Sequence, residues 1–226
     1  MAIKVISFDI DGTIIDFKYN IAFWDEAIPH LYAKRHGISL EAAKKIVLEE
    51  NDKVGQKDIR WYKPSFWFEK FDLGDHKTIL NDLKHHVNIY SDTVPALKSL
   101  HKKFKLIVVT ANTNEFVDIK LEVENMGSFF DKKFSVIDDF NGIKTPDVFK
   151  TVAETLHVLP EEIVHVGDDP QFDYVMPREL GINAFLIDRP DAYELFKKPE
   201  YRKNVDESHI IKDLRELVRK VDEMGT

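Results

Sequence analysis

Short apolar runs alternate with helix-like segments from about residue 91 onwards. Runs rich in β-branched residues are typical of buried strands, whereas apolar residues spaced three and four apart indicate amphipathic helices. Together with a run near the N-terminus, strands are expected at residues 3–8, 106–109, 134–137, 162–166 and 184–187. Helices are expected at residues 94–103, 115–125, 146–157, 174–180 and 210–224. Strands that alternate with helices form a parallel sheet covered on both faces, so the pattern predicts a doubly wound α/β fold.

Residues 17–90 differ from this pattern, because helical spacing continues there without a convincing strand. Helices are expected at residues 20–36, 39–50, 64–71 and 76–86. Gly37 stands where the first of them should stop, and Ser39 where the second needs an N-cap. We therefore interpret residues 17–90 as a small all-helical insert, and residues 1–16 with 91–226 as the core that it interrupts.

Composition narrows the class of protein. The chain has 226 residues and a net charge of −8 with both signs well mixed, which argues against a general nucleic-acid or anionic-membrane surface. It has no cysteine, so disulfides are excluded and the cytoplasm is favoured. No segment approaches the roughly 20 apolar residues that span a bilayer, and the N-terminus does not resemble a signal peptide. We expect a cytoplasmic protein, monomeric or homodimeric.

Polar side chains gather just after several predicted strands and ahead of one helix. Ligands bind at the carboxyl ends of the strands in sheets of this kind, so these positions carry the functional weight. Four groups of residues, far apart in sequence, make up the set, and at least three groups are expected on one edge of the sheet. The members are Asp9, Asp11, Thr110, Asn112, Lys144, Asp168, Asp169 and Asp173.

The carboxylates in this set predict a metal site. Two unit charges about 4 Å apart repel by roughly 4 kcal/mol at an effective dielectric constant near 20. A crevice that holds several carboxylates therefore needs a cation, and oxygen ligands suit a hard ion, most obviously Mg²⁺. Magnesium keeps several waters and readily accepts a phosphate oxygen, so the site suits a small phosphorylated substrate.

The same residues supply the parts of a phosphoryl-transfer reaction. Asp9 can act as a carboxylate nucleophile that forms an aspartyl-phosphate. Asp11 can protonate the leaving oxygen and later activate water. Thr110, Asn112 and Lys144 can donate hydrogen bonds to phosphoryl oxygens.

Each group also has a simpler explanation by itself. An Asp-X-Asp-Gly run occurs in surface turns and calcium loops, and a single lysine is usually solvated. Here the run follows a buried strand, and the four groups each lie beside an apolar strand or a helix start. That arrangement favours the functional interpretation.

The motifs resemble those of the haloacid dehalogenase-like hydrolases over residues 3 to about 188. The run 9–13 resembles the first motif of that family, 108–110 the second, Lys144 the third, and 167–169 with Asp173 the fourth. The family often has Lys-Pro-Asp-Pro before an apolar residue and Phe, whereas Lys144 here is offset by one position relative to Phe149.

The resemblance implies a Rossmann-like core with the first strand central, and a helical cap between the first and second motifs. It implies that Asp9, the main-chain carbonyl of Asp11 and Asp168 hold Mg²⁺, with Asp169 or Asp173 assisting. By the same resemblance Asp9 is the nucleophile and Asp11 the general acid and base. Thr110 and Lys144 would then bind the phosphoryl group.

Asp11 separates the possible reactions. Halide leaves without a proton, whereas an alcohol needs one, so an acid at this position favours a phosphatase or a sugar-phosphate mutase over a 2-haloacid dehalogenase. A non-catalytic protein with a vestigial site is the remaining alternative. Arg60 or Lys63 is a candidate for a second anionic group of the substrate, although packing of the neighbouring aromatic residues is the favoured interpretation. The stretch after Arg189 shows no motif that identifies a site.

Overall fold

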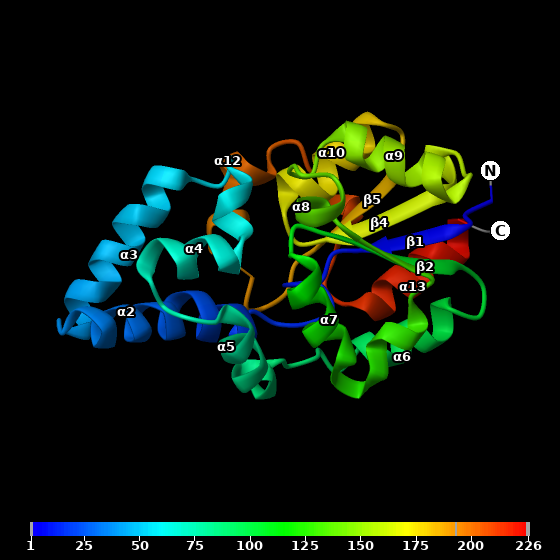
Figure 1. Cartoon of the computed structure of the whole chain (residues 1–226). Helices are drawn as coiled ribbons and strands as arrows, with labels where there is room; N and C mark the ends of the chain where they lie inside the picture. Colours follow the sequence, from blue (N-terminus) through cyan, green and yellow to red (C-terminus); the bar gives the residue numbers. More distant parts are fainter. Residues whose placement is uncertain (1, 193, 225–226) are drawn as a thin grey trace.

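The computed structural model describes residues 2–192 and 194–224. Within them, a six-stranded sheet has the order β3-β2-β1-β4-β5-β6, and all of its neighbouring strands are parallel (Figure 1). The strands are β1 Val5–Phe8, β2 Lys105–Thr110, β3 Lys132–Ser135, β4 Ile163–Gly167, β5 Asn183–Ile187 and β6 Ile210–Ile211. Because β1 lies between β2 and β4, the predicted doubly wound α/β fold with a central first strand is confirmed.

Helices cover both faces of the sheet. Alternate side chains of a strand point to opposite faces. Ile6 and Phe8 accordingly pack with α6 (Thr93–Leu100), α7 (Asn114–Glu122) and α13 (Leu214–Met224), whereas Val5 packs with α9 (Pro146–Leu156) on the other face. These helices lie on opposite sides of the sheet in Figure 1. The helices of the core are α6 Thr93–Leu100, α7 Asn114–Glu122, α8 Val136–Asp139, α9 Pro146–Leu156, α10 Met176–Glu179, α11 Glu194–Lys197, α12 Pro199–Arg202 and α13 Leu214–Met224.

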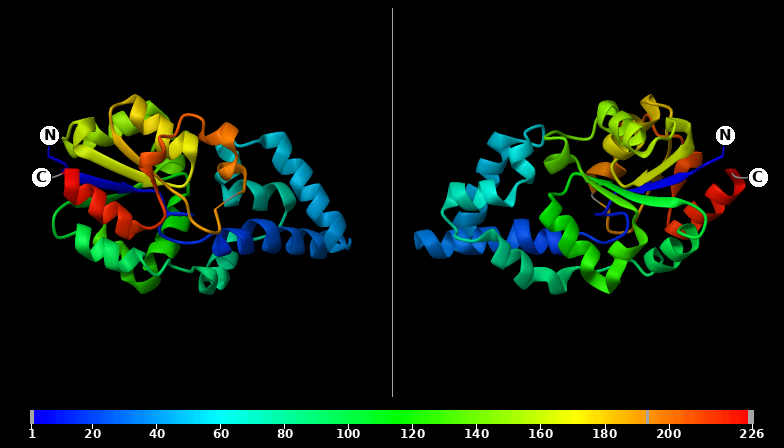
Figure 2. Two further views of the ribbon diagram at one scale, coloured as in Figure 1. Left: turned by 180° about the vertical axis from the view of Figure 1, so that it is seen from behind. Right: turned by 45° about the vertical axis from the view of Figure 1, so that its right-hand side comes forward.

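The part of the chain between β1 and α6 is helical and forms its own apolar cluster, which we call the helical segment (residues 17–90). Figure 2 shows it beyond the carboxyl ends of the strands. Gly37 ends α2 in the left-handed conformation, and the Ser39 side chain accepts from the Ala42 N–H at 3.2 Å, as expected. Its helices are α1 Lys18–Asn20, a π-helical stretch Ile21–Ala27, α2 Ile28–His36, α3 Leu40–Val54, a 3₁₀ turn Ile59–Tyr62, α4 Pro64–Phe71, α5 His76–Asp82 and a 3₁₀ turn Leu83–His86.

The helical segment is joined to the core by shared aromatic packing. Phe116 of α7 belongs to the same buried cluster as Tyr19, Phe23 and Phe68. Its ring lies edge-on to Phe23 with centroids 5.2 Å apart. Among the described residues, no helix has the length and apolar character needed to cross a membrane.

Two predicted elements near strand ends are wrong. Residues 134–137 do not form one strand, since Ser135 ends β3 and its hydroxyl accepts from the Asp138 N–H at 3.0 Å, which starts α8. Residues 210–224 do not form one helix, since Ile210 and Ile211 pair with β5 before α13 begins at Leu214. Two residues are too short a run for periodicity to identify as a strand.

Two predicted helices also differ in form. The expected helix 115–125 ends earlier, because Glu124 and Asn125 have positive φ angles of 50° and 54°. The expected helix 174–180 begins instead as a π-helical stretch, Pro170–Val175, and becomes α10 only at Met176. A π turn has a wider hydrogen-bonded ring than an α turn, so it shifts the side chains that follow.

A buried ion pair fastens the C-terminal elements to the loop after β1. Arg189 Nη1 donates to both carboxylate oxygens of Asp92, at 2.9 and 3.0 Å, and its Nη2 donates to the carbonyl of Thr13 at 2.6 Å. Asp92 also accepts from the Leu214 N–H at 2.7 Å, at the start of α13. Both members of the ion pair are nearly inaccessible to solvent.

Breaking this pair should be costly. We expect Asp92→Ala to lower the free energy of unfolding by on the order of 3 kcal/mol, because the Arg189 charge stays buried without its partner. Asp222→Ala is the matched control, since Asp222 pairs with Lys103 on the surface, where such pairs contribute little. Denaturant titration of both variants measures the difference in the free energy of unfolding. Equal losses in the two variants would show that the Arg189–Asp92 pair contributes no more to stability than a surface pair.

Candidate active site

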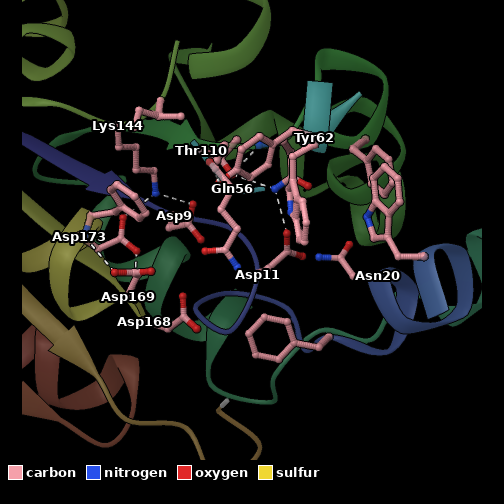
Figure 3. Close-up of a pocket in the computed structure, with 18 of the residues that line it drawn as sticks. Asp9, Asp11, Asn20, Gln56, Tyr62, Thr110, Lys144, Asp168, Asp169 and Asp173 are labelled. Carbon is pink, nitrogen blue, oxygen red and sulfur yellow. Dashed lines mark hydrogen bonds and ion pairs between the residues drawn. The ribbon is translucent and has the colours of Figure 1, made fainter. Parts of the chain in front are cut away.

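A cavity of about 480 Å³ lies between the core and the helical segment (Figure 3). Its floor is formed at the carboxyl ends of β1, β2 and β4, where Asp9, Thr110 and Asp168 are found. All eight residues predicted for the site line this cavity, although they come from four distant parts of the sequence. They are Asp9, Asp11, Thr110, Asn112, Lys144, Asp168, Asp169 and Asp173.

Lys144 joins two of the carboxylates. Its Nζ donates to Asp9 Oδ1 at 2.7 Å and to Asp173 Oδ1 at 2.5 Å, and all three side chains are buried. The sequence offset of Lys144 therefore does not keep it from Asp9. Burial lowers the pKa of Lys144, but Asp173 and Asp9 more than offset this and raise it above its ordinary value. Lys144 thus stays charged.

Ser7 and His165, which the sequence analysis missed, continue the hydrogen-bonded chain from Asp173 into the sheet. They sit side by side in the register of β1 and β4. Burial lowers the pKa of His165, so its ring is neutral and carries one N–H. His165 Nε2 lies 3.1 Å from Asp173 Oδ1, an acceptor, so Nδ1 accepts from the Ser7 hydroxyl at 2.8 Å. The signal was available, since each is a single polar residue within an apolar strand.

The carboxyl groups of this cluster differ in their affinity for protons. Burial raises the pKa of Asp173, but Lys144 and His165 more than offset this and hold it well below its usual range. Burial raises the pKa of Asp9 to about 7, against the opposing charge of Lys144. Burial and the charges of Asp9 and Asp173 raise the pKa of Asp168 well above its ordinary value.

Asp168 supplies the observation that fits a metal ion. Its Oδ2 is buried and has no hydrogen-bond partner among the described residues. Oxygens of Asp9, Asp168 and Asp173 all lie within 4.8 Å of one another. Both oxygens of Asp173 are engaged, Oδ1 by Lys144 and His165 and Oδ2 by the N–H of Asp169, whereas Lys144 holds Asp9 through Oδ1 alone. Asp9 and Asp168 are therefore the carboxylates left for a cation. Asp169 instead accepts from the N–H groups of residues 171 and 172, where it caps the π-helical stretch.

Two glycines make this crowding possible. Gly12 has φ of +63°, and a Cβ there would lie 2.5 Å from Asp168 Oδ2 and 2.6 Å from the Phe17 ring. A Cβ on Gly167 would collide with the Asp173 carboxyl group. The carboxyl groups of Asp168 and Asp173 therefore lie closer to the main chain than they could if these glycines were residues with a Cβ.

Asp11 is held by a second buried lysine that the sequence analysis did not identify. Lys120 Nζ, on α7, donates to both oxygens of Asp11, at 2.7 and 2.8 Å. It also donates to the side-chain oxygens of Asn112 at 2.9 Å and of Asn20 at 2.8 Å. Because Asn20 belongs to the helical segment, Lys120 links both parts of the protein to Asp11. Helical spacing alone does not distinguish this lysine from a solvated one.

Asn112 also holds the Asp11 carboxylate by a hydrogen bond. Its Nδ2 donates to Asp11 Oδ2 and to Thr110 Oγ1, both at 2.8 Å. Its oxygen accepts from Lys120, so every polar atom of its side-chain amide is engaged. The Thr110 hydroxyl accepts from Asn112 and keeps its own proton available for another acceptor.

The walls of the cavity are largely aromatic. Trp61 and Tyr62 contribute to them as part of the aromatic run noted in the sequence, but Arg60 and Lys63 are not among the described lining residues. Arg60 is exposed and paired with Asp58 at 2.6 Å. The stretch after Arg189, in which the sequence shows no motif, also contributes to the lining through α11. The apolar and aromatic lining consists of Phe17, Ile21, Trp24, Trp61, Tyr62, Trp67, Ala111, Phe116, Ile143, Phe172, Leu195 and Phe196.

The chain is similar to known hydrolases over most of its length. Residues 3–181 match the model of the haloacid dehalogenase-like hydrolase family. The crystal structure of a HAD phosphatase from Thermococcus onnurineus is 28% identical, with a TM-score of 0.81 over 97% of this chain and 98% of that chain. GMP/IMP nucleotidase YrfG of Escherichia coli is 21% identical over 84% of this chain and 85% of the relative. Pyrophosphatase PpaX of Bacillus cereus is 26% identical over 89% and 92%.

The raised pKa values make stability depend on pH in the metal-free protein. Unfolded carboxyl groups release protons near pH 4, whereas folded Asp9 and Asp169, with pKa values of about 7 and about 6, still hold theirs. The folded state therefore binds more protons between about pH 4 and pH 7, so stability falls as pH rises through that window. We expect Tm in EDTA, followed by calorimetry, to decline there and to level off above pH 7.

Removing one carboxylate should relieve the repulsion. We expect Asp168→Asn to raise Tm in EDTA at pH 8 by on the order of 5 °C, and to remove the rise in Tm that Mg²⁺ gives the unchanged protein. Asp118→Asn, at an exposed pair with Lys133, is the control. A variant that is less stable in EDTA, or that still responds fully to Mg²⁺, would contradict this account.

Proposed function

Because the chain belongs to the haloacid dehalogenase-like hydrolases, we propose that it is a Mg²⁺-dependent phosphatase that acts on a small phosphorylated metabolite through an aspartyl-phosphate. The observation that carries this proposal is Asp11, whose carboxylate Lys120 and Asn112 hold in the same cavity as Asp9. A proton donor is required by an oxygen leaving group and is needless for halide. The phosphatase and nucleotidase among its relatives support the same reaction class.

In the proposed reaction, an Asp9 carboxylate oxygen forms a bond to phosphorus as the bond to the leaving oxygen breaks. Asp11 gives its proton to that leaving oxygen. In the second step Asp11 takes a proton from water, whose oxygen attacks the phosphorus and releases phosphate and Asp9. Lys144, beside Asp9, and the hydroxyl of Thr110 would donate to the phosphoryl oxygens. Asn112, whose amide is fully engaged, is proposed to orient Asp11 instead.

Asp9, the main-chain carbonyl of Asp11 and Asp168 would hold Mg²⁺, with Asp173 and Asp169 fixed behind them by Lys144, His165 and the helix N–H groups. When bound, the ion would offset the repulsion between these carboxylates and the phosphoryl group. We propose that residues 17–90 act as a cap over the site and that residues 1–16 and 91–226 form the catalytic core. The aromatic side chains that residues 17–90 contribute to the cavity support that role.

Replacing the nucleophile tests the reaction directly. We expect Mg²⁺-dependent phosphate release from p-nitrophenyl phosphate, and a fall of at least about 10³-fold in kcat for Asp9→Asn, which keeps the shape of the side chain but cannot attack phosphorus. Asp118→Asn should keep its activity. Full activity in Asp9→Asn with an unchanged Tm would rule out the mechanism.

The role of Asp11 predicts a dependence on the leaving group. In Asp11→Asn, kcat/KM for an alkyl phosphate should fall by about 10²–10⁴-fold, because an alkoxide needs the proton in the phosphorylation step that kcat/KM reports. The kcat/KM for p-nitrophenyl phosphate should fall much less, because p-nitrophenolate is a stable anion. Steady-state kinetics measure the contrast in kcat/KM, since loss of the base for water attack lowers kcat for both substrates. Equal losses would show that Asp11 is not the acid, and halide release from a 2-haloacid would favour the dehalogenase instead.

A further inference from the structure

The charge of the cavity restricts what can be attached to the phosphoryl group. Among the described lining residues, Lys144 is the one with a cationic side chain, and it is occupied by Asp9 and Asp173. Asp25 adds an acidic group to the far wall. A second anionic group on the substrate would therefore enter a half-buried space without a counter-charge, which is costly.

The shape of the walls favours a flat group. Trp24 is stacked on Phe116 with centroids 5.7 Å apart and an interplanar angle of 7°, and it lies edge-on to Phe23 at 4.8 Å. Trp67 is buried, and its indole N–H donates to the carbonyl of Trp61 at 3.1 Å, which positions Trp61 in the wall. These rings are held in place before any ligand binds. Rigid aromatic faces bind planar rings by stacking and cost little conformational entropy.

The edge of such a group would meet neutral amides. Gln56 and Asn51 line the cavity, and their side-chain amides make no hydrogen bond to any other residue that the structure describes. Gln56 and Tyr62 lie in the cavity near Asp9 and Asp11 in Figure 3. An amide offers both a donor and an acceptor, so it suits a ring whose edge carries both.

We infer that the substrate is a monophosphate ester of a planar, uncharged group with hydrogen-bonding atoms at its edge, the class to which nucleoside 5′-monophosphates belong. This inference rests on the proposed phosphatase function and adds the leaving group that the cavity accepts. Trp24 and its neighbours contact the faces of the ring, and Gln56 and Asn51 contact its edge. A volume of about 480 Å³ lies within the range of pockets that hold ligands of this size.

Substrate kinetics on the Mg²⁺-loaded enzyme test the inference. We expect kcat/KM for nucleoside 5′-monophosphates to exceed that for 2-phosphoglycolate and for fructose 1,6-bisphosphate by at least about tenfold. p-Nitrophenyl phosphate reports whether the chemistry itself is present. Turnover of p-nitrophenyl phosphate together with a preference for either substrate that carries a second anionic group would overturn the inference. The proposed phosphatase function would still stand. No turnover of any phosphate ester would overturn both.

A charge inserted into the wall should change the preference. In Gln56→Lys, kcat/KM for 2-phosphoglycolate relative to a nucleoside 5′-monophosphate should rise by about tenfold or more, because the new ammonium group supplies the missing counter-charge. Asn81→Lys adds the same charge on α5, outside the lining, and should leave the ratio as it is in the unchanged enzyme. Equal kcat/KM ratios in the two variants, with Tm values unchanged, would show that Gln56 does not contact the leaving group of the substrate.

Discussion

Charge balance in one cavity is the constraint on which the rest of the structure depends. Two buried lysines face the carboxylates there: Lys144 pairs with both Asp9 and Asp173, and Lys120 pairs with Asp11. Asp168 is left with a buried oxygen that no described residue satisfies. The carboxylates that share the cavity are Asp9, Asp11, Asp168, Asp169 and Asp173. The fold thus brings together more negative charge than its own lysines compensate, an excess that suits a cation.

The sequence was enough to predict the elements whose burial is uniform. β1, β2 and β4 are buried almost throughout, so each appears as an apolar run whose end can be located within a residue or two. Those ends carry Asp9, Thr110 and Asp168, and parallel topology then brings them to one edge of the sheet. The helical character of residues 17–90 could be predicted because helix ends depend on residues next to them in the sequence. Gly37 ends one helix through its backbone conformation, and Ser39 begins the next through a local hydrogen bond.

What the sequence did not reveal depends on contacts between distant residues. Lys120 lies 109 positions from Asp11, and nothing near it in the chain indicates that its ammonium group is buried. His165 and Ser7 are separated by 158 positions and meet only through the pairing of two strands. β6 has two residues, so its pairing with β5 defines it rather than any pattern of its own. In each case the partner, and not the local sequence, determines the role.

The π-helical stretch Ile21–Ala27 has a consequence for how this protein can evolve. It contributes Ile21, Trp24 and Asp25 to the cavity wall. The carboxylates and lysines that pair with one another in the site lie outside this stretch. Successive residues of an α-helix are about 100° apart around its axis, and a π turn accommodates one residue more than an α turn. Insertion or deletion of a single codon ahead of Trp24 in this stretch would therefore turn Trp24 away from Phe116 and present a different side chain to the cavity. The lining of the cavity can change by such a step while the sheet that holds Asp9 and Asp168 keeps its sequence.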